Sequence, residues 1–210
     1  MDAGFWHRRW EQKDIGFHES DVNGLLVDHF KDLPIQENGN VFVPLCGKTR
    51  SIAWLLAKGY SVVGVELNQT AVEELFEELD VIPEIEEKRP LKIYSAPSVT
   101  VFVGDFFALS NDLIGPVDAV FDRAALVALP QTMRADYTQH LMAITNKAPQ
   151  LLIVYEYDES LMKGPPFPIP EIEVKSHYQD RYQVSLLKRY EMPDGLKDKK
   201  PVKEIAWLLT

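Results

Sequence analysis

The stretch VFVPLCGKTRSIAWLLAKGYSVVGVE, residues 41–66, decides the fold of this 210-residue chain. An apolar run over 41–43 is followed by a turn with one glycine and then by apolar residues at helical spacing. A second apolar run, 62–65, ends at the acidic Glu66. This order predicts a βαβ unit of an open parallel sheet, in which ligands bind at the carboxyl ends of the strands. An acid at that place can accept hydrogen bonds from both hydroxyls of a ribose, so the stretch predicts a nucleoside-cofactor site.

The glycine content of the turn discriminates between three nucleoside cofactors. A pyridine dinucleotide requires G-x-G-x-x-G, but this turn has only Gly47, with Leu45 and Cys46 before it. A phosphate loop has the pattern G-x-x-x-x-G-K-[ST]. Gly47-Lys48-Thr49 matches the end of this pattern, but its first glycine would fall at position 42, where the chain has Phe42. S-adenosylmethionine carries no phosphate and needs one close backbone approach and an acid for its ribose. Gly47 and Glu66 meet these needs, so we expect S-adenosylmethionine as the cofactor.

Each residue of this motif also has a purely structural interpretation. Gly47 is in that case a turn glycine that supplies a positive φ, and Glu66 a solvated strand end. Their occurrence together in the correct order favours the ligand site. Cys46, with Lys48 nearby, suggests a reactive thiolate, but a small apolar filler in a glycine turn is the preferred interpretation.

Composition excludes several classes of function. Hydrophobic residues make up 46% and charged residues 26% of the chain, as in an ordinary soluble protein. The net charge of -10 argues against nucleic acid and against an anionic membrane surface as partners. We expect no membrane span and no signal peptide. The single cysteine excludes an internal disulfide and a multi-cysteine metal site. We therefore expect a cytosolic protein without a metal, and a monomer.

The first 40 residues predict a helical extension. Trp6 and Trp10 lie at helical spacing and form an aromatic stripe, which either packs on the core or serves as a lid over the cofactor. A second helix is predicted over 20–31, with Ser20 as its N-cap. We expect residues 1–40 to form an N-terminal helical lid on a core of residues 41–210, within a single domain of residues 1–210.

Beyond residue 66 the pattern alternates between helices and strands. Asn68 or Thr70 is predicted to cap a helix whose acidic face is solvated, and residues 83–97 are predicted to be a surface insertion. We expect strands over 99–103, 117–121 and 151–155, helices over 124–129, 134–147 and 171–178, and a C-terminal antiparallel hairpin of 182–190 with 202–209.

Polar residues follow three of the predicted strands. They are Glu66, Asp105 and the pair Asp122-Arg123, and the carboxyl ends of parallel strands meet at one edge of a sheet. Asp105 is suited to accept from the adenine amino group while Phe106 covers the ring; the alternative is a helix N-cap. Arg123 is suited to face a ligand; the alternative is a salt bridge to Asp122 or Glu66.

Taken together, these residues resemble one known family. The chain resembles the thiopurine S-methyltransferases, of bacterial type in its compact insertion and length, in Trp6, Trp10, Phe17-His18, residues 44–48, residues 62–66, residues 122–128 and residues 164–167. The resemblance implies a class I methyltransferase: a Rossmann-like α/β fold with a seven-stranded, mostly parallel sheet, helices on both faces and a terminal hairpin.

The resemblance also implies roles for individual residues. S-adenosylmethionine is expected at Trp6, Trp10, Leu45, Glu66, Asp105, Phe106 and Arg123, in addition to Gly47. Phe17 and Arg123 are expected to face the acceptor, together with Pro166 and Phe167 of the proline-rich loop. The expected acceptor is a small aromatic or heterocyclic thiol such as a thiopurine, and bacterial members are associated with selenium and tellurium compounds as well.

The chain departs from the family pattern at two places. Ser51 stands where an acid is frequent, and residues 192–203 form a shorter segment with lysines in place of an arginine. No catalytic base is assigned, because an aromatic thiol is partly ionised near neutral pH; Arg123, Asp14 and His18 are the candidates for assisting. Two other functions remain open: a nucleoside-binding module without methyl transfer, and a nucleotide-dependent oxidoreductase.

Overall fold

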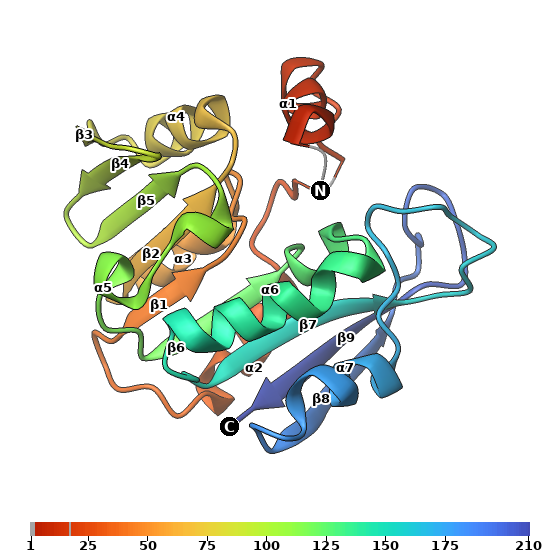
Figure 1. Cartoon of the computed structure of the whole chain (residues 1–210). Coiled ribbons are helices and arrows are strands. Elements are labelled where there is room, and N and C mark those ends of the chain that lie inside the picture. The colour runs from red at the N-terminus through yellow and green to blue at the C-terminus, as the bar shows by residue number, and fades with distance from the viewer. Residues whose placement is uncertain (1–2, 17) are drawn as a thin grey trace. The chain divides into compact units, whose positions relative to one another are not determined.

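The computed structural model describes residues 3–16 and 18–210 (Figure 1). Phe17, a predicted acceptor residue, lies outside the described residues. The chain divides into two compact units. The first unit holds residues 3–23 and Ile35–Asp118, and the second holds Gly24–Pro34 and Ala119–Thr210. The single domain with a boundary at residue 40 stays a prediction.

The first unit contains the predicted βαβ motif. Strand β1 (Asn40–Val43), helix α3 (Arg50–Ala57) and strand β2 (Ser61–Glu66) follow one another, and β1 pairs in parallel with β2. Strand β5 (Val99–Val103) is parallel to β2 on its other side, with Glu66 opposite Val103. All three strands are buried except at a few positions, because helices cover them. Their carboxyl ends therefore lie at one edge, as predicted.

The helices of the first unit begin at polar caps. The Thr49 hydroxyl accepts a hydrogen bond from the Ser51 N–H at the start of α3. The Asn68 side chain accepts one from the Ala71 N–H at the start of α4 (Gln69–Glu78), so Asn68 is the cap of this helix. Both helices pack against β2. The remaining helices of this unit are α1 (Ala3–Glu11), the 3-10 helix η2 (Phe106–Ala108) and α5 (Asn111–Ile114).

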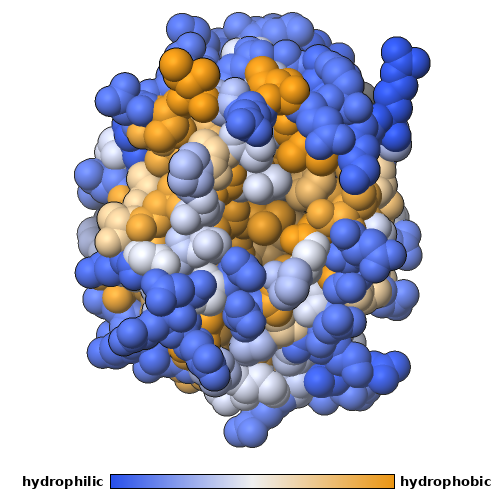
Figure 2. Space-filling view, turned by 90° about the vertical axis from the view of Figure 1, so that its left-hand side faces the viewer, coloured by the Kyte–Doolittle hydropathy of each residue, from blue (hydrophilic) through white to orange (hydrophobic). Residues whose placement is uncertain are grey.

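The surface insertion predicted for residues 83–97 forms a hairpin, which was not predicted. Strands β3 (Glu84–Lys88) and β4 (Leu91–Ala96) pair with each other, and β4 is antiparallel to β5. The hairpin was missed because β3 is rich in charged residues. Every residue of β3 is exposed, and among the described strands only β4 pairs with it. Its charged side chains disfavour pairing with another chain. On the face shown in Figure 2, orange hydrophobic side chains gather toward the middle, and blue hydrophilic side chains surround them.

The second unit contains four strands. Strand β6 (Ala119–Arg123) is parallel to β7 (Gln150–Glu156), β9 (Lys203–Leu209) is antiparallel to β7, and β8 (Val184–Glu191) is antiparallel to β9. The C-terminal hairpin is confirmed. The described residues thus contain nine strands, two more than the seven expected, and the β3–β4 hairpin accounts for the difference.

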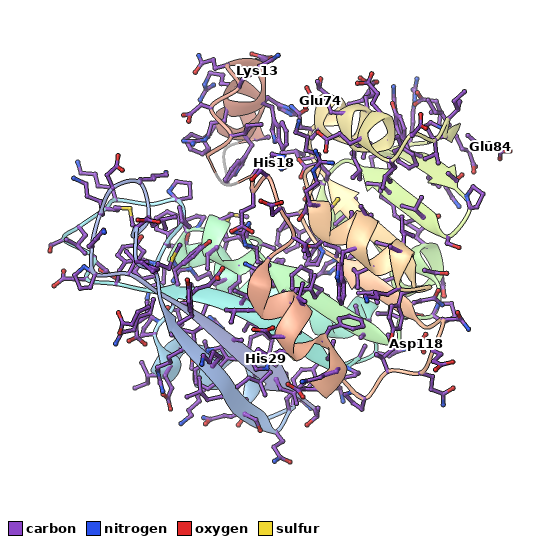
Figure 3. All side chains as sticks on the ribbon, turned by 180° about the vertical axis from the view of Figure 1, so that it is seen from behind. Lys13, His18, His29, Glu74, Glu84 and Asp118 are labelled. Carbon is purple, nitrogen blue, oxygen red and sulfur yellow. The ribbon has the colours of Figure 1, made fainter. Side chains whose placement is uncertain are left out.

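Helices cover both faces of the strands in the second unit. Helices α6 (Gln131–Ile144) and α7 (Glu171–Tyr178) pack together, and α6 lies in front of β7 in Figure 1. Helix α2 (Gly24–His29), continued by η1 (Phe30–Asp32), packs against β7 and lies in front in the reverse view of Figure 3. No described helix is long and apolar enough to span a membrane.

Two predicted helices are shorter than expected. The helix over 20–31 begins only at Gly24, because the Ser20 hydroxyl donates to the Asp21 carboxylate instead of capping a helix. The helix over 124–129 is reduced to the 3-10 turn η3 (Leu126–Ala128). Ala124 has a φ of 68°, a left-handed conformation in which a regular helix cannot continue.

Candidate functional site

Glu66 is the last residue of β2, and only 7% of its surface is exposed. Its Oε2 accepts a hydrogen bond from the Gly47 N–H at 2.9 Å, and its Oε1 accepts one from the Asn68 N–H at 2.8 Å. Burial raises the pKa of the Glu66 carboxyl, and the backbone N–H groups oppose this shift. The interpretation as a solvated strand end is therefore wrong. Each oxygen has a second lone pair, so the carboxylate is held ready to accept from a ligand.

The turn after β1 brings the backbone toward this carboxylate. Leu45 and Gly47 both have left-handed backbone conformations, with φ of 46° and 51°. The Cys46 N–H donates to the Val65 carbonyl at 2.9 Å, which fixes the turn on β2. A Cβ at position 47 would stand 3.1 Å from Cζ2 of Trp10, so glycine is needed for close approach as well as for φ. A strained Leu45 beside such a turn is typical of a ligand site.

Two contacts hold helix α1 on this turn. The Trp10 ring, buried to 7% exposure, packs on Gly47, and His7 Nδ1 lies 3.2 Å from Asn68 Nδ2. Trp6 lies one turn earlier on the same helix, edge-on to Phe5 with ring centroids 5.2 Å apart. Helix α1 is therefore positioned next to the Glu66 carboxylate, while contact of Trp6 with a cofactor stays a prediction.

The neighbours of the turn have packing and ion-pair roles. Lys48 Nζ lies 2.8 Å from Glu74 and 3.0 Å from Glu78, two acids of α4 that the sequence had placed on a solvated face (Figure 3 labels Glu74). The hydrogen bond to Glu74 is the main cause of the raised pKa of Lys48. Cys46 is buried, and burial raises the pKa of its thiol well above the usual value. A neutral, buried thiol agrees with the filler interpretation.

Asp105 and Phe106 follow the neighbouring strand β5. The Gly104 N–H donates to the Glu66 carbonyl at 2.9 Å, so this strand end lies beside that of β2. The Asp105 Oδ1 accepts from the Phe107 N–H at 3.0 Å and caps η2, as the structural alternative for Asp105 predicted. The Phe106 ring is 5% exposed. The proximity of Asp105 to the predicted ribose acid is confirmed, and its contact with adenine stays a prediction.

Arg123 ends β6 in the second unit. Its Nη2 donates to the Tyr155 hydroxyl at 3.0 Å, and its Nε lies 3.8 Å from Oε1 of Glu204. The side chains of Arg123 and Glu204 are only 9% and 8% exposed. An ion pair is present, and Glu204 is a partner that sequence order could not indicate, because it lies near the end of the chain.

Asp122 is completely buried, and because it precedes Arg123 in β6, its side chain points to the opposite face of the sheet. Its Oδ2 accepts from the Tyr137 hydroxyl at 2.7 Å, and its Oδ1 accepts from the Leu126 N–H at 3.2 Å. Burial raises the pKa of Asp122 to about 6, against the opposing effect of these hydrogen bonds. Asp122 therefore holds the turn at Ala124, which follows Arg123 directly.

Asp122→Asn should change how stability depends on pH. The raised pKa means that the folded protein holds a proton that the unfolded chain has lost, so the stabilisation is present below pH 4 and is lost as pH rises through about 6. Removing this ionisation should make the variant gain roughly 3 kcal/mol relative to the parent protein between pH 4 and pH 7. Urea unfolding across that range measures the difference, with Asp180→Asn at an exposed position as control. Parallel curves for Asp122→Asn and the parent protein would refute the assignment.

The proline-rich loop carries the predicted acceptor residues Pro166 and Phe167. The Tyr157 hydroxyl donates to the Pro166 carbonyl at 2.5 Å, and the Phe167 N–H donates to the Val127 carbonyl at 2.7 Å. The loop is therefore tied to η3, the turn that begins three residues after Arg123. The second unit thus holds Phe167 and the turn after Arg123 in one hydrogen-bonded assembly.

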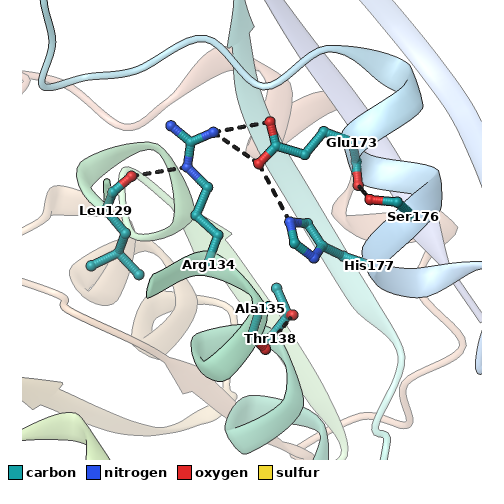
Figure 4. A network of polar contacts seen from close by, with 7 residues as sticks. All are labelled: Leu129, Arg134, Ala135, Thr138, Glu173, Ser176 and His177. Atoms are coloured by element: carbon teal, nitrogen blue, oxygen red, sulfur yellow. Dashed lines mark hydrogen bonds and ion pairs between the residues drawn. The ribbon is translucent and has the colours of Figure 1, made fainter. Parts of the chain in front are cut away.

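A network around Arg134 completes this assembly (Figure 4). Nη1 of Arg134 donates to both carboxylate oxygens of Glu173 at 2.8 and 2.9 Å, and Nε donates to the Leu129 carbonyl at 2.9 Å. The guanidinium also lies 5.4 Å from the centroid of the Phe167 ring. His177 Nε2 is 3.4 Å from Glu173 on the same helix. We call Arg134, Glu173 and Phe167 the Arg134 clasp.

The remaining catalytic candidates lie in the first unit. Asp14, whose side chain is 61% exposed, accepts a hydrogen bond from Arg9 at 3.1 Å. The His18 N–H donates to the Ile15 carbonyl at 2.8 Å, in the segment after α1 (Figure 3). This placement agrees with the solvated interpretation of Asp14, and the assisting role of Asp14 and His18 stays a prediction.

Comparison with known proteins decides the family. Residues 1–207 match the family described as Thiopurine S-methyltransferase (TPMT). The chain belongs to this family. It is 52% identical over 210 residues to the thiopurine S-methyltransferase of Xanthobacter autotrophicus, covering 100% of this chain and 99% of the relative. It is 47% identical over 210 residues to that of Teredinibacter turnerae, covering 100% and 98%.

Solved structures show the same fold at low identity. A Burkholderia thailandensis 1,6-didemethyltoxoflavin-N1-methyltransferase with bound S-adenosylhomocysteine superposes with a TM-score of 0.65 at 13% identity, over 99% of this chain and 85% of that chain. The class I, Rossmann-like methyltransferase fold expected from the resemblance to the thiopurine S-methyltransferase family is confirmed, with strands in excess of seven.

The first unit fits the cofactor of a thiopurine S-methyltransferase. A buried carboxylate with both oxygens oriented by N–H groups suits two ribose hydroxyls, which donate hydrogen bonds. The turn around Gly47 offers one close backbone approach and no cradle for a pyrophosphate. Glu66, Gly47, Leu45 and Asp105 would hold S-adenosylmethionine at the ends of β1, β2 and β5.

The sequence did not predict the contacts of several residues near the candidate site. His7 and Glu204 owe their contacts to chain segments that are distant in sequence, so no local pattern marks them. Asn68 was predicted only as a cap, although its N–H also orients Glu66. Arg134 could have been suspected, because it lies at helical spacing from Tyr137 and Leu141 on the inward face, and a buried arginine rarely lacks a partner.

Proposed function

We propose that this protein transfers the methyl group of S-adenosylmethionine to the sulfur of thiopurines and related heterocyclic aromatic thiols. Its membership of the thiopurine S-methyltransferase family supports the reaction class. The observation that carries the proposal is the buried Glu66 carboxylate, which the N–H groups of Gly47 and Asn68 orient at the end of β2. This arrangement recognises a ribose without a phosphate.

When bound, S-adenosylmethionine supplies a methyl group on a positively charged sulfonium, which passes to the acceptor sulfur and leaves neutral S-adenosylhomocysteine. The residues of this chain bind and orient the cofactor. Glu66 accepts from the ribose hydroxyls, Asp105 accepts from the adenine amino group, and Phe106 packs on the adenine ring. Trp10, which packs on Gly47, excludes water from the part of the cofactor that lies at this turn.

The acceptor residues proposed are Arg123, Pro166 and Phe167. An aromatic thiol is partly ionised near neutral pH, so its proton passes to water and no strong base is required. The sulfur lone pair forms the new C–S bond. The Arg123 guanidinium favours the thiolate or donates to a ring nitrogen of a purine, and the loop of Pro166 and Phe167 provides a flat apolar wall. Because Tyr157 and Val127 tie this loop, the wall is formed before the acceptor binds.

One assay separates this proposal from the two other functions. Calorimetric titration should show binding of S-adenosylmethionine and none of NADH, and 6-mercaptopurine should give one equivalent of S-methyl product per S-adenosylhomocysteine, counted by chromatography. Binding without transfer to 6-mercaptopurine or benzenethiol would favour a binding module. Binding of NADH instead would favour an oxidoreductase. Selenium and tellurium acceptors, the cytosolic location and the monomeric state stay predictions from the sequence.

A further inference from the structure

The second unit contains two buried arginine–glutamate pairs of different geometry. Arg134 and Glu173 form a closed pair, with two hydrogen bonds of 2.8 and 2.9 Å. Arg123 and Glu204 form an ion pair with Nε and Oε1 3.8 Å apart, a separation too long for a hydrogen bond. The closed pair is typical of a structural contact, whereas the looser pair places two opposite charges side by side without locking them together.

Glu204 is held at the ion pair by the sheet. It lies on β9, opposite Tyr155 of β7 in the strand register, and the Tyr155 hydroxyl accepts a hydrogen bond from Arg123 Nη2 at 3.0 Å. The three side chains therefore converge from neighbouring strands: Arg123 from the end of β6, Tyr155 from β7 and Glu204 from β9. Because the backbone of all three is in strands, their side chains start from fixed positions in the sheet.

A carboxylate at this distance offsets the charge of the guanidinium. The pair is nearly dry, with side-chain exposures of 9% and 8%, so water screens it little. An acceptor beside Arg123 therefore meets little net positive charge. Two lysines of the C-terminal hairpin have other partners: Lys203 lies 3.3 Å from Glu191, and Lys197 donates to the Pro165 carbonyl at 2.9 Å.

We propose that Glu204 is a specificity-determining residue, which offsets Arg123 so that the enzyme favours acceptors without a second negative charge. This inference rests on the proposed function and on Arg123 as an acceptor residue. It defines the substrate class further: uncharged heteroaromatic or aromatic thiols are preferred to thiols that also carry a carboxylate. In this assignment Glu204 is a positioning and charge-setting residue that does not itself contact the acceptor.

The test compares benzenethiol with 4-mercaptobenzoate as acceptors at one pH and low ionic strength. Glu204→Gln keeps the shape of the side chain and removes its charge. The ratio of kcat/KM for 4-mercaptobenzoate to that for benzenethiol should rise about tenfold in this variant. Glu204→Asp, which keeps the charge, should leave the ratio within about twofold of the parent protein. An unchanged ratio in folded Glu204→Gln would overturn the inference.

Two matched controls isolate the charge at position 204. Glu171→Gln makes the same exchange at an exposed ion pair with Lys175, and Glu87→Gln makes it at an exposed ion pair with Lys92. Neither should change the acceptor ratio. A rise in the ratio with either control would also overturn the inference, because it would show an unspecific effect of net charge.

A second pair of variants keeps the test valid if Glu204→Gln does not fold. Arg123→Gln alone leaves the Glu204 carboxylate facing the acceptor, whereas Arg123→Gln with Glu204→Gln removes both charges and leaves a neutral pair. The acceptor ratio should be higher in the double variant than in Arg123→Gln. Equal ratios would refute the role of Glu204. Failure of the parent protein to methylate either thiol would instead refute the proposed function.

Discussion

Glu66→Ala should weaken the binding of S-adenosylmethionine by about 5- to 150-fold, or roughly 1–3 kcal/mol, the range expected for hydrogen bonds to a charged group. The alanine loses both acceptors for the ribose hydroxyls. It also leaves the N–H groups of Gly47 and Asn68 without their carboxylate, so the turn and the start of α4 lose a common anchor. Calorimetric titration of the folded variant measures the effect on affinity.

Two further variants separate the loss of affinity from a loss of folding. Glu66→Gln should give an intermediate affinity, because its amide oxygen can accept from one N–H group while its NH₂ faces the other. Glu77→Ala removes an acid from the exposed face of α4 and should bind the cofactor like the parent protein. An affinity of Glu66→Ala equal to that of Glu77→Ala would remove Glu66 from the site.

The part of this site that the sequence predicted is encoded locally. Residues 41–66 contain strand, turn, helix, strand and acid in order, and the structure confirms each of these elements and brings Gly47 next to Glu66. The missing glycines of the turn also discriminated between cofactors, because the backbone approach that a pyrophosphate needs can be judged from one short segment. Close packing of Trp10 on Gly47 was not predictable in the same way, since it joins residues 37 positions apart.

The proposed acceptor residues of the second unit are held by contacts between distant segments. Arg123 meets Glu204, 81 positions later, and Arg134 meets Glu173, 39 positions later. Neither partner could be chosen from the sequence, which offers 32 acidic residues as candidates. The β3–β4 hairpin was missed for another reason. Its strand β3 is exposed on all five residues, so the apolar alternation that marks a half-buried strand is absent.

Arg134→Ala should lower the free energy of unfolding by about 3–5 kcal/mol, because it leaves the largely buried Glu173 carboxylate without its guanidinium. The Leu129 carbonyl loses a donor, and the Phe167 ring loses the cation beside it. Urea unfolding measures the loss. Lys175→Ala, which breaks the exposed pair with Glu171, is the control and should cost under about 1 kcal/mol. Equal costs for the two variants would show that the Arg134 clasp contributes nothing.

A double variant distinguishes an unpaired charge from lost packing. Arg134→Met with Glu173→Met removes both charges and should be more stable than Arg134→Met alone, because no buried carboxylate is left uncompensated. Arg134→Lys retains the charge but lacks the Nε that donates to the Leu129 carbonyl and the planar guanidinium that lies beside the Phe167 ring. Since Phe167 N–H remains bonded to Val127, the loop should stay in place in this variant, with the ring less well oriented. KM for 6-mercaptopurine should then rise while the affinity for S-adenosylmethionine is unchanged, which assigns the clasp to the acceptor wall and not to the cofactor.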